Sequence, residues 1–177
     1  MSPDRQLDPE ALGDHIDRLY RAARSMTRSR EEAEDLVQET LARVLRKPRV
    51  LRSEDDIGYL LRVLRNTYVS TLRTQARRPQ TTALPDDLEV VEDHKAAQPG
   101  ARLEHQDLYA AIASLPDDFR DAIVAIDVVG LSYREASKTL RVREATVTTR
   151  LHRARQRVAK ALAEADPDLP QLRSKED

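Results

Sequence analysis

The sequence predicts an all-α protein made of two small helical domains that are joined by a flexible acidic linker. Apolar residues recur at spacings of three and four along most of the 177 residues, which is the period of an amphipathic helix. Signals for strands are nearly absent, because the chain holds only four glycines and few alternating apolar and polar runs. In the middle, residues 79–104 carry three prolines, a cluster of acids and weak apolar periodicity, a composition typical of linkers.

This pattern divides the chain into four segments. A length of 177 residues suits one ordinary domain or two small ones. The predicted segments are a helical unit at 14–79, a linker at 80–104, a second helical unit at 105–163 with a helix-turn-helix at 133–152, and a disordered tail at 164–177.

Two helices are predicted before Pro48. The second one begins in "SREEAEDLVQETLARVLRK", where Ser29 suits the N-cap and Glu32 stands three residues later, as a capping box requires. Acids fill its first turn, where the helix dipole favours them, and Pro48 stops it. The first helix is expected within residues 14–27, with an apolar stripe formed by Ile16, Leu19, Tyr20 and Ala23.

A third helix is predicted in "IGYLLRVLRNTYVSTLRTQARR", which ends before Pro79. No acidic residue occurs between Ile57 and Pro85, although five arginines fall there. Charge of one sign along a helix indicates a polyanionic partner. The residues expected to face the core are Leu60, Leu61, Leu64, Val69 and Leu72.

Residues 130–162, "GLSYREASKTLRVREATVTTRLHRARQRVAKAL", predict two helices joined by a short turn. Ser132 and Glu135 form a capping box at the start of the first helix. Arg141 stands in the turn; it costs little if its φ is negative and of order 1 kcal/mol if φ is positive. On the second helix, the residues expected inside are Val147, Leu151, Ala154 and Val158, and those expected outside are Ala145, Thr149, His152, Arg153 and Gln156.

The outer face of that second helix carries hydrogen-bonding and cationic groups and no carboxylate, which suits the major groove of duplex DNA. Charged residues make up 34% of the chain while its formal net charge is only −1. Affinity for nucleic acid must therefore come from charge that is segregated along the chain. The other interpretation of the same face is a basic solvated helix at the end of a bundle, where the dipole favours arginine.

Several classes of function are disfavoured by what the sequence lacks. There is no cysteine, and the four histidines show no metal-ligand spacing, so we expect no metal and no cofactor. No phosphate loop, paired carboxylates or nucleophile with a nearby base is present, so we expect no catalytic residues and no enzyme. The start of the chain is polar and no apolar run approaches the roughly 20 residues of a membrane span, so we expect a cytoplasmic protein without membrane insertion.

The motifs resemble those of extracytoplasmic-function (ECF) sigma factors of bacterial RNA polymerase. In the C-terminal half these are "LP" at 115–116, "LSY" at 131–133, "TV" at 146–147 and "RLHRAR" at 150–155. In the N-terminal half, "SREEAEDLVQETLARVLRK" is similar to the start of the family's region 2 and "YLLRVLRNTYVSTLRTQARR" to its later helix. The resemblance covers residues 14–163.

The resemblance implies a promoter-specificity subunit that binds core RNA polymerase and promoter DNA. Residues 14–79 would be sigma region 2 and residues 105–163 sigma region 4. Asp35, Gln38, Glu39 and Arg43 would bind core polymerase. The polymerase surfaces implied by the resemblance are the clamp helices of the largest subunit and the flap. The minus-ten element would meet Arg62, Arg65, Asn66, Thr67, Ser70 and Arg73, and residues 51–58 match the loop that captures a flipped base in the family. The minus-thirty-five element would meet Thr148, Thr149, His152 and Arg153, with Arg143, Arg150, Arg155 and Arg157 on phosphates.

The resemblance also implies a stress or envelope-response regulon and an anti-sigma partner. Two other functions remain open on the residues alone. The first is a free-standing dimeric helix-turn-helix regulator that binds paired half-sites without polymerase. The second is a sigma-like decoy that binds an anti-sigma factor and never touches DNA.

Overall fold

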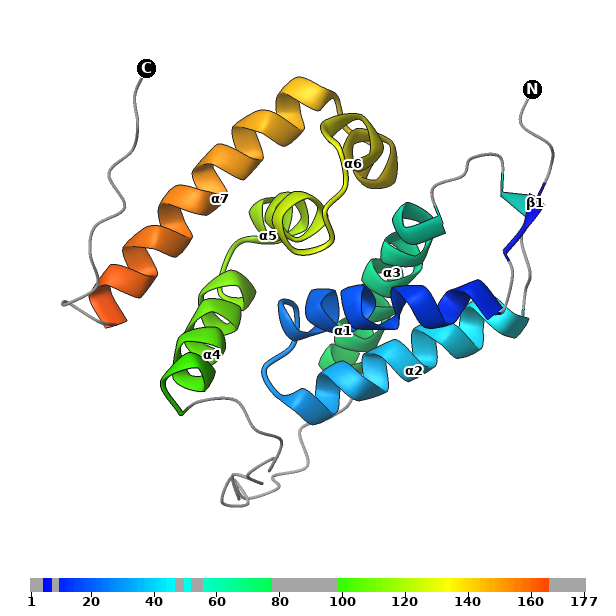
Figure 1. Ribbon diagram of the computed structural model, residues 1–177, viewed down its shortest axis with the longest axis horizontal. Helices are drawn as coiled ribbons and strands as arrows, with labels where there is room; N and C mark the ends of the chain where they lie inside the picture. Colours follow the sequence, from blue (N-terminus) through cyan, green and yellow to red (C-terminus); the bar gives the residue numbers. More distant parts are fainter. Residues whose placement is uncertain (1–4, 8–9, 47–49, 52–55, 78–98, 166–177) are drawn as a thin grey trace.

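The computed structural model describes residues 5–7, 10–46, 50–51, 56–77 and 99–165, and within them the chain is almost wholly helical (Figure 1). The N-terminal unit holds the 3-10 helix η1 (Glu10–His15), α1 (Ile16–Arg24), α2 (Arg30–Arg46) and α3 (Asp56–Arg77). The C-terminal unit holds α4 (Pro99–Ala113), α5 (Asp117–Ile123), the π-helix η2 (Val124–Val128), α6 (Tyr133–Leu140) and α7 (Glu144–Ala165). The two-unit helical architecture predicted from apolar periodicity is confirmed.

The N-terminal unit is a bundle in which α1 and α2 pack on each other and on α3 (Figure 1). Its core is built from buried residues at helical spacing, such as Leu19 on α1, Leu36 on α2 and Leu60 on α3. The Ser29 hydroxyl accepts the Glu32 amide at 3.1 Å, as predicted. The Glu32 carboxylate accepts a hydrogen bond from the amide of Arg28 at 2.9 Å. A capping box would instead use the amide of Ser29, one residue later.

The sequence prediction was wrong at three places in this unit. Residues 14–15 belong to the 3-10 helix, so α1 starts at Ile16, whose side chain is 42% exposed instead of lying on the apolar stripe. Leu72 is likewise 42% exposed. A two-stranded antiparallel pair, β1 (Arg5–Gln6) with β2 (Val50–Leu51), was not predicted, because strands of two residues carry no periodicity.

The segment between the units falls largely outside the described residues. Residues 80–98 of the predicted linker lie there, whereas 99–104 form the first turns of α4. Of the predicted tail, residues 164–165 complete α7 and 166–177 lie outside the described part. The predicted connector 51–58 is shortened, because α3 begins at Asp56 and its first turn is buried.

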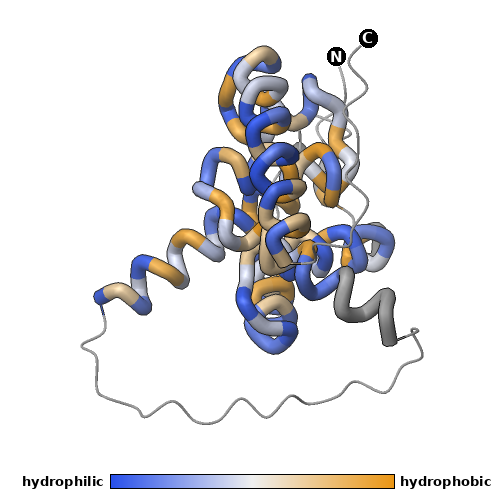
Figure 2. The backbone as a smooth tube through the Cα atoms, turned by 90° about the vertical axis from the view of Figure 1, so that its left-hand side faces the viewer, coloured by the Kyte–Doolittle hydropathy of each residue, from blue (hydrophilic) through white to orange (hydrophobic). Residues whose placement is uncertain are grey.

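In the C-terminal unit, α7 packs along α4, α5 and α6 with one apolar face (Figure 1). Val147, Leu151, Ala154 and Val158 are all buried, so the predicted inner face of α7 is confirmed. Hydrophobic and hydrophilic segments alternate along the helices in Figure 2, as expected of amphipathic helices that share a core.

The two units contact each other through α3 with α6 and through α1 with η2. Arginines of the N-terminal unit extend into this contact. The Arg18 guanidinium donates from Nε to the carbonyl of Val129 at 2.9 Å, and Arg24 lies 5.5 Å from the ring centre of Tyr109.

Candidate nucleic-acid and polymerase interfaces

The helix-turn-helix is formed by α6 and α7. Ser132 and Glu135 make the predicted capping box at the start of α6: the serine hydroxyl accepts the Glu135 amide, and the Glu135 carboxylate accepts the Ser132 amide at 2.7 Å. The Ser132 hydroxyl also donates to the Glu135 carboxylate at 2.6 Å. Because this bond and the bond from the Ser132 amide favour the ionised acid, they lower the pKa of Glu135. Arg141, in the turn, has the left-handed conformation with φ 57° and ψ 42°. In this conformation the amides of Arg141 and Val142 both donate to the carbonyl of Ser137.

The outer face of α7 is exposed where the sequence predicted base-reading residues. Thr148, Thr149, His152 and Arg153 all face solvent. The two threonine hydroxyls donate to carbonyls one turn back, at 3.0 Å each, which leaves their oxygens as acceptors toward the outside. Arg153 makes no ion pair with any described residue. This face therefore offers hydroxyl acceptors, an imidazole ring and a cation, and none of these four side chains forms an ion pair with a described residue.

The arginines predicted for phosphate contact behave differently from one another. Arg150 donates to Asp118 of α5 at 2.6 Å. Arg155 donates one hydrogen bond to each carboxylate oxygen of Asp127, at 2.9 and 2.7 Å. This pairing raises the pKa of the arginine. The fourth, Arg157, stacks on Phe119 at 4.9 Å from the ring centre, whereas Arg143 is exposed. Three of the four arginines are thus already bound to α5 and η2 in this state.

The π-helix η2 carries the carboxylate that holds Arg155. A π-turn adds one residue to the usual hydrogen-bonded ring and rotates the residues after it. Asp127 lies within this turn and faces α7. The acids of α5 and η2 therefore act as internal counter-charges for the basic helix.

The predicted minus-ten residues on α3 separate into two groups. Asn66, Ser70 and Arg73 are exposed and line a hollow of about 500 Å³. Asp117, at the start of α5, lines the same hollow from the opposite unit. Thr67 is 1% exposed and its hydroxyl donates to the Val63 carbonyl at 2.9 Å; it lines a second hollow, on the side of α3 toward α2.

Arg62 and Arg65, the remaining pair, are bound to the C-terminal unit. Arg62 donates to the carbonyl of Lys138 at 2.9 Å and to that of Thr139 at 3.3 Å. Arg65 forms an ion pair and hydrogen bond with Asp121 of α5. Burial raises the pKa of the Asp121 carboxyl, and the charge and hydrogen bond of Arg65 oppose that rise.

The predicted polymerase-binding residues lie on the outside of α2. Asp35, Gln38, Glu39 and Arg43 are all exposed. Arg43 donates to Glu39 at 2.7 Å, and this hydrogen bond lowers the pKa of Glu39. The pair is exposed on both sides, so it contributes little stability and is readily exchanged for a partner.

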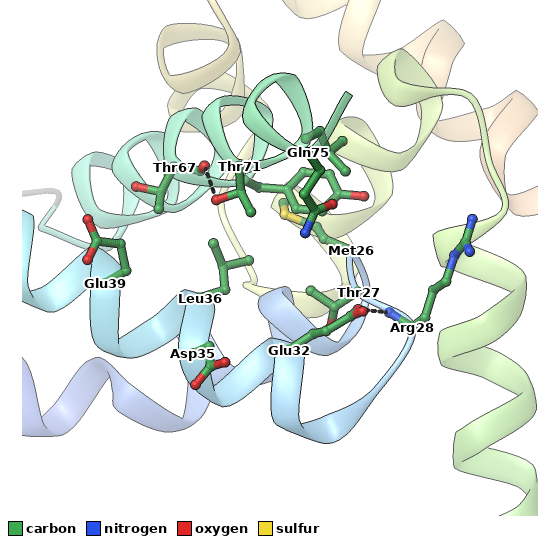
Figure 3. Close-up of a pocket in the computed structure, with 12 residues that line it drawn as sticks. Met26, Thr27, Arg28, Glu32, Asp35, Leu36, Glu39, Thr67, Thr71 and Gln75 are labelled. Atoms are coloured by element: carbon green, nitrogen blue, oxygen red, sulfur yellow. Dashed lines mark hydrogen bonds between the residues drawn. The ribbon is translucent and has the colours of Figure 1, made fainter. Parts of the chain in front are cut away.

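A groove of about 440 Å³ runs between α2 and α3 beside these residues (Figure 3). Asp35, Glu39 and Leu36 line it from α2, while Thr71 and Gln75 line it from α3. Thr71 and Gln75 were not among the residues predicted from the sequence to bind a partner. They stand one and two turns after Thr67 on the same helix face, so helical spacing alone could have placed them opposite α2.

No group of three or more potential metal ligands occurs among the residues that the structure describes. Over the same residues, no helix is long and apolar enough to cross a membrane.

Two family models match the chain, one in each unit. Sigma-70 region 2 matches residues 12–78, and Sigma-70 region 4 matches residues 105–158. Both surfaces described above lie within these ranges.

Curated relatives extend over most of the chain. ECF RNA polymerase sigma factor SigE of Mycolicibacterium smegmatis is 38% identical over 92% of this chain, which spans 64% of that protein's length. SigM of Bacillus subtilis, also an ECF RNA polymerase sigma factor, is 31% identical over 81% of this chain and 88% of its own. EcfG of Rhodopseudomonas palustris is 31% identical over 78% of this chain and 75% of its own.

Solved structures share the fold, among them two that contain a partner protein. One is the sigma factor RpoE in complex with the anti-sigma factor NepR from Bartonella quintana, with a TM-score of 0.68 and 25% identity over 89% of this chain and 96% of that one. The other is CnrH in complex with the cytosolic domain of CnrY, with a TM-score of 0.61 and 25% identity over 89% of this chain and 87% of that one.

Proposed function

The chain belongs to the family of ECF RNA polymerase sigma factors, and from that premise we propose that it binds core RNA polymerase and directs transcription initiation at a particular set of promoters. The family is not one of enzymes, and we propose that the chain has no catalytic activity of its own and acts in the cytoplasm, where the polymerase is. A stress or envelope-response regulon is consistent with the relatives.

The observation that carries this proposal is the exposed outer face of α7. It follows a capped helix and a tight turn, and it presents Thr149, His152 and Arg153 outward with no carboxylate among them. Threonine, histidine and arginine can each read base edges in the major groove. We assign Thr148, Thr149, His152 and Arg153 to recognition of the minus-thirty-five element and Arg143 to a phosphate.

The N-terminal unit supports the other two contacts. On α3, the exposed group of Asn66, Ser70 and Arg73 offers hydrogen bonds and a cation to the minus-ten element, as single-stranded DNA requires. On α2, Asp35 and Glu39 line the groove beside α3 and suit a basic segment of the polymerase clamp. Gln38 and Arg43 extend that surface.

We also propose an anti-sigma partner. The two structural neighbours were solved with NepR and with the cytosolic domain of CnrY, and this chain shares their fold over both units.

In vitro transcription tests the proposal. Adding the full chain to bacterial core polymerase should produce specific transcripts whose starts can be mapped. Arg153→Ala should reduce initiation at those promoters by about tenfold or more while leaving affinity for core unchanged, because a lost base contact costs about 1–3 kcal/mol. Lys160→Ala is the matched control, since Lys160 is an exposed cation of α7 that pairs with Glu164 at 3.8 Å.

Three outcomes would contradict the proposal. Core polymerase that neither binds the chain nor gains initiation excludes a sigma factor. A stable homodimer that protects a palindrome without polymerase indicates a free-standing regulator. Equal loss of core binding and initiation in Arg153→Ala removes the assignment of Arg153 to base recognition.

A further inference from the structure

We propose that a cavity lined by α1, α6 and the start of α3 binds a small organic phosphate of the nucleotide class. The cavity has a volume of about 660 Å³. Small-molecule sites commonly have volumes of about 300–1,000 Å³ and occur preferentially where domains meet. None of its basic residues is assigned above to promoter DNA or to core polymerase, so the proposal goes beyond the function of a sigma factor.

Four basic side chains line the cavity, two from each unit. His15 ends η1 and Arg18 belongs to α1, whereas Arg134 and Lys138 belong to α6. Arg134 and Lys138 stand four residues apart, so they lie on one face of that helix. Both are exposed, and neither forms an ion pair with a described residue. Unpaired cations on a concave surface attract an anion.

Arg18 is held in place by the loop that leads into α6. Its Nε donates to the carbonyl of Val129 at 2.9 Å. Its Nη2 lies 3.8 Å from the position that a Cβ atom would have at Gly130, so the guanidinium packs over this glycine. Because a main-chain carbonyl is a neutral acceptor, Arg18 keeps its full positive charge beside the cavity. It is a fixed cation, whereas Arg134 and Lys138 are free to meet a ligand.

The ring of His15 has a hydrogen bond to offer. It has no hydrogen-bond partner among the described residues, and its Nδ1 is buried. A buried N–H without an acceptor is tolerated less often than an unpaired acceptor. The ring proton therefore belongs on Nε2, and this nitrogen can donate to an oxygen of the ligand.

Two carboxylates also line the cavity, but neither gives it a negative surface. Glu135 accepts hydrogen bonds from the amide and the hydroxyl of Ser132 at the start of α6. These bonds, followed by the charges of Arg18 and Lys138, lower the pKa of Glu135. Asp56 is 8% exposed and begins α3, where the helix dipole compensates its charge. The charge that a ligand would meet is therefore positive.

The lining also indicates the class of ligand. Arginine binds phosphate oxygens through two parallel hydrogen bonds, and lysine binds them as a point charge. Ile57 and Leu131, buried residues that also line the cavity, add apolar surface to it. A nucleoside mono- or diphosphate combines a phosphate for the cations with a base for the apolar residues.

Isothermal titration calorimetry of the full chain with ADP and with GDP tests the proposal. At least one of them should bind at one site per chain, about tenfold or more tightly than its nucleoside or inorganic phosphate, each of which lacks part of the contacts. Arg134→Gln and Lys138→Gln should each weaken binding of the nucleotide about tenfold, because each removes a hydrogen bond between charged groups. His15→Ala, in the other unit, should weaken it about fivefold.

Lys160→Gln is the matched control. Lys160 is an exposed lysine of α7 that does not line the cavity, so its replacement should leave the affinity unchanged. Circular dichroism of each variant shows whether it is folded.

Three results would overturn the proposal. The first is no binding of either nucleotide at millimolar concentration. The second is inorganic phosphate that binds as tightly as the nucleotides, which would leave a site for simple anions. The third is an affinity that the folded double variant Arg134→Gln with Lys138→Gln does not change. Each can occur in a chain that initiates transcription with core polymerase, and nucleotide binding can persist in one that does not, so this proposal and the proposed function fail separately.

Discussion

Arg141 adopts φ 57° in the turn of the helix-turn-helix, a conformation that costs most residues about 1–2 kcal/mol. The sign of this angle could not be predicted from the residues of the turn. The turn keeps its geometry because the Arg141 and Val142 amides both donate to Ser137. The hydrogen bonds of a left-handed cap thus form here without a glycine.

Arg141→Gly should stabilise the protein by about 0.5–1 kcal/mol, because relief of the left-handed strain exceeds the added freedom of the unfolded chain. Urea unfolding of the full chain measures the change. Arg143→Gly is the control: no positive φ occurs at Arg143, so it should give no gain. A loss of stability in Arg141→Gly would show that the arginine side chain contributes more than its backbone costs.

Residue by residue, the site could be predicted only as far as helix periodicity extends. The outer and inner faces of α7 follow from its period, and both are as predicted. That Arg150 meets Asp118 and that Arg65 meets Asp121 could not be predicted, because each pair joins different helices. Periodicity tells which side of a helix a residue occupies and says nothing about what lies opposite.

At the scale of single elements, α6 depends on its capping box. Ser132→Ala should cost about 1 kcal/mol at pH 7, as loss of an N-cap does. Because the pKa of Glu135 is lower in the folded state, its share of this stabilisation is present above the unfolded pKa and lost as pH falls through the folded one. The difference between parent and Ser132→Ala should therefore shrink toward about pH 3.

Urea unfolding at both pH values measures this. The comparison is made in a protein that carries Glu135→Gln, which keeps a hydrogen-bonding side chain without a charge. In that background, Ser132→Ala should lower the free energy of unfolding by the same amount at both pH values. A cost of Ser132→Ala that is equal at pH 7 and pH 3 in the parent would contradict the part assigned to the Glu135 carboxylate.

Helices long enough to repeat their apolar pattern over several turns could be predicted from the sequence, whereas short irregular elements could not. Both capping signals marked true helix starts, at α2 and at α6. The π-turn η2 was missed, because one extra residue per turn shifts the apolar pattern too little to detect within five residues. That turn nevertheless presents Asp127 to α7, where its carboxylate pairs with Arg155, an arginine predicted to contact a DNA phosphate.

In the molecule as a whole, the positive charges of lysine and arginine nearly balance the negative charges of aspartate and glutamate, and the formal net charge is −1. The acids of α5 and η2 bind several of the arginines that would otherwise meet phosphates. We therefore expect the isolated chain to bind duplex DNA weakly, because phosphate contacts supply most non-specific binding.

Asp127→Asn should therefore strengthen binding of the protein to duplex DNA at low salt. It frees Arg155 for one phosphate, and the slope of log K against log salt should become steeper by about 0.9. Fluorescence anisotropy with a labelled duplex at several salt concentrations measures the slope. Glu34→Gln, which breaks an exposed pair with Arg30 in the N-terminal unit, should leave the slope unchanged. An unaltered slope in Asp127→Asn would mean that Arg155 does not reach the DNA backbone.

The acceptors of Arg62 and Arg18 are main-chain carbonyls, those of Lys138, Thr139 and Val129. Every amino acid carries such a carbonyl, so these acceptors survive any substitution that leaves the backbone in place. During evolution, side chains of the helix-turn-helix can therefore be substituted, and promoter preference can change, while these contacts between the two units remain. Two other arginines that reach the C-terminal unit, Arg65 and Arg24, depend on inherited side chains, those of Asp121 and Tyr109.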